Sequence, residues 1–181
     1  MINIRDIKTD PAGQPDQHDL AAITAIYRHH VLNGTASFEI EPPSSSEMAT
    51  RMAQLLAGGY PILVAMHHNT LCGYAYAGPH KPRAAYNQTV EDSVYVSDDQ
   101  RGNGIGRQLL AQLIEAAAAR GYYQMMAVIG DSDNTASIGL HRTLGFRHIG
   151  TAQKIGFKFG RRLDIVYMQR ALQSAPQSGS T

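Results

Sequence analysis

The sequence contains a single cysteine, Cys72, and no tryptophan among its 181 residues. One cysteine excludes an internal disulfide and is typical of a reducing compartment, so we expect a cytoplasmic protein. Cys72 lies in the apolar stretch "LCGYAYAG", which favours a small buried residue over a nucleophile. A chain of this length is expected to form one domain that needs no disulfide or metal for its stability.

Neither sign of charge dominates, because 16 lysines and arginines face 15 aspartates and glutamates. There is no basic run, so we expect no nucleic-acid partner. No apolar stretch approaches the ~20 residues of a membrane span, and "MINIRDIKTD" lacks the apolar core of a signal peptide. We therefore expect no membrane association and a small-molecule substrate.

Hydrophobic periodicity predicts the element order β-α-α-β-β-β-α-β-α-β-β. Strands are expected over residues 2–7, 60–66, 71–78, 90–97 and 123–129, with a final pair within 147–172. Helices are expected from residue 20, after Ser44, over 105–121 and from Asn134. This order predicts an α/β (α+β) domain over residues 1–172, with a mixed sheet between helices. Residues 173–181 are polar and rich in Pro, Gly and Ser, which predicts a flexible tail.

Three glycines, Gly102, Gly104 and Gly106, separate the strand "SVYV" from the following helix. A helix N-terminus has N–H groups without intrahelical partners and carries a partial positive charge, so it favours anions. Glycine lets a phosphate approach these groups without meeting a Cβ, and Arg101 and Arg107 flank the turn. The stretch therefore predicts a phosphate site.

The spacing of this stretch excludes two well-known phosphate motifs. A P-loop requires Lys and then Ser or Thr after its last glycine, but Arg107 and Gln108 stand there. A dinucleotide fingerprint requires a glycine three positions after Gly104, where Arg107 stands instead.

"RGNGIG" behind "SVYV" resembles the acetyl-CoA signature of the GNAT superfamily of N-acetyltransferases. Together with "YPILVA", "TVEDSVYV", "NTASIGLHRTLGF" and "GFKFGRRLDIVYMQ", it is similar to the phosphinothricin/methionine sulfoximine acetyltransferase subgroup. The resemblance implies a GNAT-like, mostly antiparallel twisted sheet with helices on both faces. It also implies acetyl-CoA as cosubstrate, no metal, a homodimer and a small amino acid-like amine as acceptor.

In that superfamily the glycine turn holds the pyrophosphate, and the preceding strand and a later helix hold the pantetheine. Carried over, the resemblance implies these cofactor-binding residues: Val94, Tyr95, Val96, Arg101, Gly102, Asn103, Gly104, Ile105, Gly106, Arg107 and Asn134.

Acetyl transfer requires an amine without its extra proton, and an alkylammonium is mostly charged at pH 7. Glu91 and Asp92 precede "SVYV" and are candidate bases or, alternatively, solvated strand-end acids. The resemblance selects Glu91 as the general base, acting through water. His141 stands where many superfamily members have a Tyr that protonates the leaving thiolate. It is either a proton donor to that thiolate or a helix residue packed against the sheet.

The loop "PHKPRAAY" is the expected acceptor-recognition segment, with Arg83 and Lys81 for a carboxylate and Tyr86 to close the pocket. The full predicted acceptor set is Phe38, Lys81, Arg83, Tyr86, Glu91, Asp92 and Ser93. The sequence has Glu39 after Phe38, where herbicide-resistance members of the subgroup have Arg. We therefore expect activity on methionine sulfoximine and little on phosphinothricin.

Two alternatives stay open at this stage. The first keeps the enzyme but changes the acceptor to another small amine, such as a polyamine or aminoglycoside, or to a protein N-terminus; Arg83 and Lys81 favour an anionic acceptor. The second is a non-catalytic acyl-CoA-binding sensor, which would keep "RGNGIG" but has no need of Glu91.

Overall fold

The computed structural model of the protein describes residues 1–173. Its strands are β1 (Ile2–Asp6), β2 (Ile62–His67), β3 (Thr70–Pro79), β4 (Thr89–Val96), β5 (Gln124–Gly130), β6 (Arg147–Lys158) and β7 (Arg161–Ala171). Its helices are α1 (Gln17–Asn33), α2 (Ser45–Ala57), α3 (Ile105–Ala119) and α4 (Thr135–Thr143). The predicted element order is confirmed. Of the predicted flexible tail, residues 174–181 lie outside the described residues.

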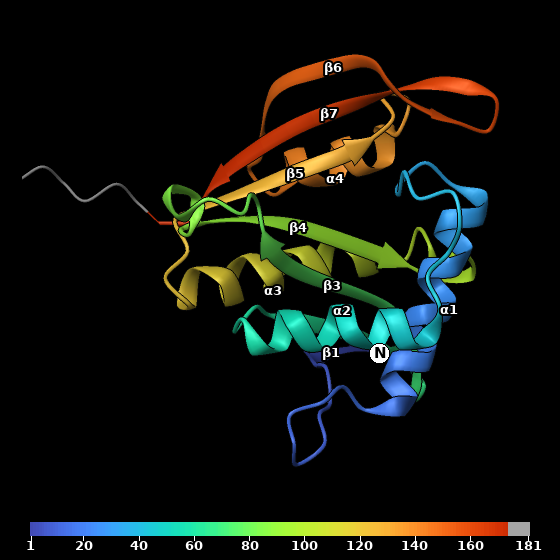
Figure 1. The fold of residues 1–181 in the computed structure, drawn as a ribbon, viewed down its shortest axis with the longest axis vertical. Coiled ribbons are helices and arrows are strands. Elements are labelled where there is room, and N and C mark those ends of the chain that lie inside the picture. The colour runs from blue at the N-terminus through green and yellow to red at the C-terminus, as the bar shows by residue number, and fades with distance from the viewer. Residues whose placement is uncertain (174–181) are drawn as a thin grey trace, which may run out of the picture.

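All seven strands belong to one sheet, in the order β1-β2-β3-β4-β5-β7-β6 (Figure 1). β4 and β5 run parallel, and every other pair of neighbouring strands is antiparallel. The predicted mixed, mostly antiparallel sheet is therefore confirmed. The single parallel pair lies in the middle of the sheet, where α3 connects its two strands.

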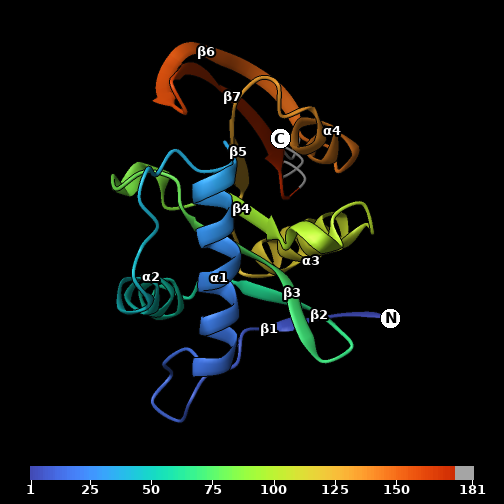
Figure 2. The same ribbon diagram turned by 90° about the vertical axis from the view of Figure 1, so that its right-hand side faces the viewer.

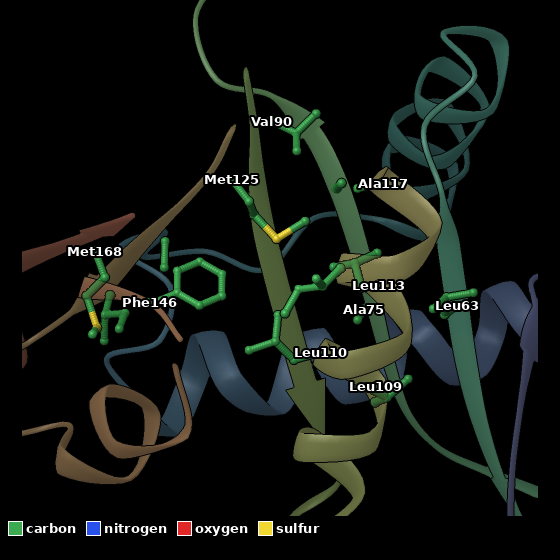
Figure 3. Packing of buried hydrophobic residues seen from close by; sticks show 14 of the residues in the cluster. Leu63, Ala75, Val90, Leu109, Leu110, Leu113, Ala117, Met125, Phe146 and Met168 are labelled. Atoms are coloured by element: carbon green, nitrogen blue, oxygen red, sulfur yellow. The ribbon is translucent and has the colours of Figure 1, made fainter. Parts of the chain in front are cut away.

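Helix α3 covers one face of the sheet, and α4 lies on the same side (Figure 2). The buried side of α3 contributes Leu109, Leu110 and Leu113, which pack with Met125 of β5 and with Phe146 (Figure 3). Their spacing of three and four residues places these leucines on one side of the helix. This cluster joins the two halves of the sheet across β4 and β5.

Helices α1 and α2 cover the opposite face (Figure 2). Ile23 and Val31 of α1 and Met48 and Met52 of α2 are almost fully buried, against the ring of Tyr74 on β3. Both faces of the sheet are thus covered by helices, as predicted.

Helix α1 begins earlier than the periodicity predicts. The Asp16 carboxylate accepts hydrogen bonds from the backbone N–H groups of His18 and Asp19, so Asp16 is the N-cap. The sequence analysis began the helix at Leu20 because the first turn is polar. The predicted Ser44 cap is confirmed, since its hydroxyl accepts from the Glu47 N–H.

The described residues bear on two further expectations, a membrane span and a metal site. Within residues 1–173, no helix is long and apolar enough to cross a membrane. The same part of the chain has no cluster of three His, Cys, Asp or Glu side chains that would hold a metal ion. Cys72 is buried, as predicted, and its thiol donates to the Ala65 carbonyl oxygen.

Candidate active site

β4 and β5 pair over only part of their lengths. Their parallel ladder joins Thr89–Asp92 to Gln124–Ala127, whereas β4 continues to Val96 and β5 to Gly130. Beyond Asp92 the two strands diverge, and they form a V that opens toward α1 (Figure 1). Backbone N–H and C=O groups on the inner edges of the V are available to a ligand.

A cleft of about 720 Å³ occupies this V and extends over the glycine turn to the start of α4. It brings together most of the predicted cofactor residues: Val94, Tyr95, Val96, Arg101, Gly102, Gly104, Ile105, Gly106, Arg107 and Asn134. Asn103 is exposed and is not among the lining residues. The cleft is also lined by Asp92, Ser93 and His141.

The three glycines of the turn have different conformations. Gly102 and Gly104 have φ angles of 80° and 75°, in the left-handed region that side chains disfavour. Gly106 has an ordinary helical conformation, and a Cβ there would lie 3.5 Å from Leu140 Cδ2 and 3.8 Å from Val96 Cγ2. Gly102 and Gly104 therefore set the backbone conformation of the turn. Gly106 is the glycine whose missing side chain leaves space in the cleft.

The start of α3 lacks a side-chain cap. Gly104 is the N-cap residue, and the first helical hydrogen bond runs from the Gln108 N–H to the Gly104 carbonyl oxygen. The N–H groups of Ile105, Gly106 and Arg107 precede that bond and line the cleft. This is the arrangement that holds an anion such as a pyrophosphate.

Side chains alternate along a strand, so Glu91 and Tyr95, four residues later, lie on the same face of β4. Tyr95 packs with residues of α1 and α2, so Glu91 lies on that side of the sheet. Its Oε2 is 3.1 Å from Nδ1 of His80, and its side chain is 36% exposed. Partial burial raises the pKa of Glu91, although contact with His80 opposes this shift. A carboxylate with a raised pKa is a stronger base than an ordinary glutamate.

Asp92 lies on the other face of β4 and pairs with His141 of α4. Asp92 Oδ2 is 2.9 Å from His141 Nε2, and the two side chains are 2% and 5% exposed. His141 Nδ1 is 2.7 Å from the Ser137 carbonyl oxygen. Burial lowers the pKa of His141, but the carboxylate of Asp92 and the carbonyl together raise it above its usual value.

The loop between β3 and β4 places the predicted acceptor residues at the surface. Lys81 and Arg83 are exposed and do not line the cleft. They also do not line a second pocket, on the α1/α2 face, which is described below. Lys81 Nζ lies 5.4 Å from the Tyr86 ring centre, and that ring meets the His80 ring edge-on at 5.9 Å. The loop thus reaches Glu91 through His80.

Phe38 contacts β5 and β6. Its ring packs so closely on Gly130 of β5 and Gly156 of β6 that a Cβ at either position would clash with it. Glu39, beside it, accepts hydrogen bonds from Arg51 at 2.7 Å and from the Tyr27 hydroxyl at 3.0 Å. The Arg51 guanidinium, which also pairs with Glu47, therefore offsets part of the negative charge of Glu39.

A second pocket, of about 290 Å³, lies between α2 and the sheet, on the same face as Glu91. Arg51, Tyr27 and Tyr76 line it, together with methionine and leucine side chains from α2. Tyr76 is paired with Ser93 in the β3–β4 ladder, two residues from Glu91. The sequence analysis missed this pocket, although the alternating tyrosines of "YAYAG" indicated that several rings share one face.

Three further residues at the cleft were not predicted. The buried His30 donates from Nε2 to the Val96 carbonyl oxygen at 2.9 Å, which fixes the end of β4. Asp131, buried and with a φ of 71°, pairs with Arg161 of β7 at the far side of the V. These contacts join segments that are far apart in the sequence, so no local pattern indicates them.

Comparison with known proteins places this arrangement in one family. Residues 14–167 match the model described as "Acetyltransferase (GNAT) domain". The chain belongs to this family. The fold, the enzyme class and the superfamily that the sequence predicted are therefore confirmed for this GNAT acetyltransferase.

Two curated relatives and one solved structure are closely similar. The chain is 52% identical over 156 residues to the phosphinothricin N-acetyltransferase of Alcaligenes faecalis, covering 86% of this chain and 79% of the relative. It is 48% identical over 165 residues to the L-methionine sulfoximine/L-methionine sulfone acetyltransferase of Pseudomonas paraeruginosa, covering 87% and 94%. A phosphinothricin acetyltransferase of Sinorhizobium meliloti, crystallised with AcCoA, superposes with a TM-score of 0.87 at 43% identity, covering 98% and 94%.

Proposed function

We propose that this GNAT acetyltransferase transfers the acetyl group of acetyl-CoA to the amino group of a small glutamate-like amino acid. Acceptors of the methionine sulfoximine or phosphinothricin type fit the proposal. The observation that carries it is the position of Glu91, a partly buried carboxylate with a raised pKa where β4 and β5 begin to part. The names of the close relatives support the same acceptor class.

The cleft has the features that acetyl-CoA requires. The uncapped N–H groups of α3 suit its pyrophosphate, and the exposed guanidinium groups of Arg101 and Arg107 add positive charge beside them. The unpaired edges of β4 and β5 suit the amides of its pantetheine arm. Bound acetyl-CoA would supply an activated acetyl thioester.

Glu91 would remove a proton from the acceptor's ammonium group, directly or through one water. A backbone N–H between Val94 and Val96, on the edge of β4 that no longer pairs with β5, would donate to the thioester oxygen as it gains charge. His141 would form, with Asp92, a fixed ion pair at the cleft. Lys81 and Arg83, exposed on the loop that follows β3, would attract the acceptor's acidic groups.

The identity of the acceptor depends on the surroundings of Glu39. The sequence alone led us to expect little activity on phosphinothricin, since Glu39 removes a positive charge. Arg51 stands 2.7 Å from that carboxylate and also pairs with Glu47 at 2.9 Å, so it offsets part of the negative charge of Glu39. We therefore propose that both acceptors are used and that methionine sulfoximine retains only a modest preference.

A panel of amines, assayed for CoA release with acetyl-CoA, tests the proposal. It is headed by methionine sulfoximine and phosphinothricin and includes glutamate, a polyamine, an aminoglycoside and a peptide with a free N-terminus. We expect turnover to be highest with the first two. Faster turnover of the polyamine or the peptide would refute the acceptor class, and a protein that does not bind acetyl-CoA would refute the whole proposal.

We also propose a homodimer formed through β6. This edge strand and its turn expose Ile149, Ile155, Phe157 and Phe159, each between 50% and 61%. A long apolar edge strand is a surface that proteins usually cover. Light scattering should give twice the 19.7 kDa chain mass, and Ile155→Lys should halve it; a wild-type monomer at micromolar concentration would contradict the dimer.

A further inference from the structure

The imidazole of His141 lies between two acceptors. Nε2 faces the Asp92 carboxylate at 2.9 Å, and Nδ1 faces the Ser137 carbonyl oxygen at 2.7 Å. The Ser137 hydroxyl is further from Nδ1, at 3.4 Å. Carbonyl and carboxylate oxygens only accept, whereas a neutral imidazole has a single N–H to donate. Both contacts are therefore satisfied together when both ring nitrogens carry a proton.

The shared proton belongs on the ring and not on the carboxyl group. In water an imidazolium loses its proton about 2.6 pKa units above an aspartic acid. Contact with Asp92 and the Ser137 carbonyl raises the pKa of His141 further, against the opposing effect of burial. The pair is thus an imidazolium and a carboxylate, enclosed almost completely by the protein.

The pair of Asp92 and His141 lies where β4 and β5 part, at the cleft. Asp92 is paired with Ala127 in the last rung of the β4–β5 ladder, and both Asp92 and His141 line the cleft. Asp92 Oδ1 is buried and has no hydrogen-bond partner within residues 1–173. The pair also ties α4, which carries Asn134 at its start, to the strand that bears Glu91.

We propose that Asp92 is a positioning residue, whose carboxylate holds His141 in place as an imidazolium at the vertex of the cleft. The proposal assigns Asp92 a role different from the acceptor binding expected from the sequence. It rests on the proposed function only where activity is concerned. Both N–H groups of the ring are engaged by protein acceptors, so His141 contributes one end of a fixed ion pair and no transferred proton.

Among the groups around His141, Asp92 is the charged group that favours the imidazolium. On its own helix the ring meets the carbonyl and hydroxyl oxygens of Ser137, and from the following turn the uncharged Phe146 ring packs edge-on at 5.0 Å. From β4 it meets Asp92. Of the groups that shift the pKa of His141, Asp92 is the one that carries a charge.

The decisive variant is Asp92→Asn, which keeps the size of the side chain. The amide can turn its NH₂ toward Nε2, which suits a neutral ring that donates from Nδ1 to Ser137. The variant therefore removes the charge on His141 without removing the contact. Asp92→Glu keeps the carboxylate, and Asp99→Asn, at an exposed acid outside the cleft, is the matched control.

The first readout is an NMR titration of the histidine rings in ligand-free protein, with the His141 signals assigned by their loss in His141→Gln. We expect wild-type His141 to lose its proton above the usual histidine pKa of 6.5. In Asp92→Asn it should deprotonate at least one pH unit lower, a tenfold change in its proton affinity. A neutral His141 in the wild type at pH 6.5, or an unchanged titration in Asp92→Asn, would overturn the proposal.

The second readout is the pH dependence of kcat with saturating substrates. We expect the high-pH decline of kcat to move to lower pH in Asp92→Asn by at least one unit, and to return toward its wild-type position in Asp92→Glu. A merely structural Asp92 would lower kcat equally at all pH values. The titration needs no acceptor, so it separates failure of this proposal from failure of the proposed function.

Discussion

Glu91 and Asp92 are neighbours on β4, and each contacts a histidine, yet they lie on opposite faces of the sheet. Glu91 is partly exposed beside His80, and partial burial raises its pKa. Asp92 is almost fully buried against His141. The difference shows how one strand can present an accessible carboxylate on one face and a buried ion pair on the other.

The largest expected effect on activity comes from changing the accessible carboxylate. Glu91→Gln keeps the shape and removes the base, so kcat should fall by about 10²- to 10⁴-fold. The dissociation constant of acetyl-CoA, measured by calorimetry, should stay within about twofold of wild type, because Glu91 does not line the cleft. Loss of cofactor binding in this variant would contradict the division between the two faces.

The same comparison predicts the opposite order for stability. Asp92→Ala removes the partner of a buried imidazolium, which must then stay unpaired or lose its proton, and should lower the free energy of unfolding by about 3 kcal/mol or more. Glu91→Ala, which breaks only a partly exposed pair, should cost about 1 kcal/mol or less. Urea unfolding of both variants measures this, and equal losses would show that the two environments do not differ as described.

The smallest expected effect concerns Gly106, at the start of α3, where the cleft is lined by the predicted cofactor residues. Gly106→Ala adds a Cβ that meets protein atoms only at ordinary contact distances, so stability should be unchanged or slightly higher. The methyl group projects into the cleft and should weaken acetyl-CoA binding by about tenfold, or 1.4 kcal/mol. The KM for the acceptor should not change.

Gly139→Ala is the matched control for this variant. Gly139 lies on α4 with open space around its Cα and does not line the cleft. It should bind acetyl-CoA as the wild type does. Equal weakening in both variants would mean that Gly106 has no special relation to the cofactor.

Local patterns were sufficient to predict the order of the helices and strands, and they predict an anion site at the start of α3. The turn around Gly104 combines a strand, glycines and an amphipathic helix within a few residues, so spacing alone indicated an anion site. Strand alternation also contained the information that Glu91 and Asp92 face opposite ways, but the sequence analysis grouped both with the acceptor. That grouping stays untested for the acceptor itself.

Pairs formed across the fold could not be read from the sequence. Asp92 and His141 are 49 residues apart, and Asp131 and Arg161 are 30 apart. Such contacts depend on the register of the sheet and on where α4 docks, which no local propensity specifies. The compensation of Glu39 by another side chain was missed for the same reason.

The most direct test of the account is the pH dependence of single-turnover acetyl transfer to methionine sulfoximine, in wild-type protein and in Glu91→Gln, both preloaded with acetyl-CoA. Because the pKa of Glu91 is raised, its proton is lost above the usual value of 4.5, and the base form accumulates as pH rises. We predict that the wild-type rate contains a rise with this ionisation that is absent from the variant. Superimposable pH profiles of equal rate would contradict a base role for Glu91.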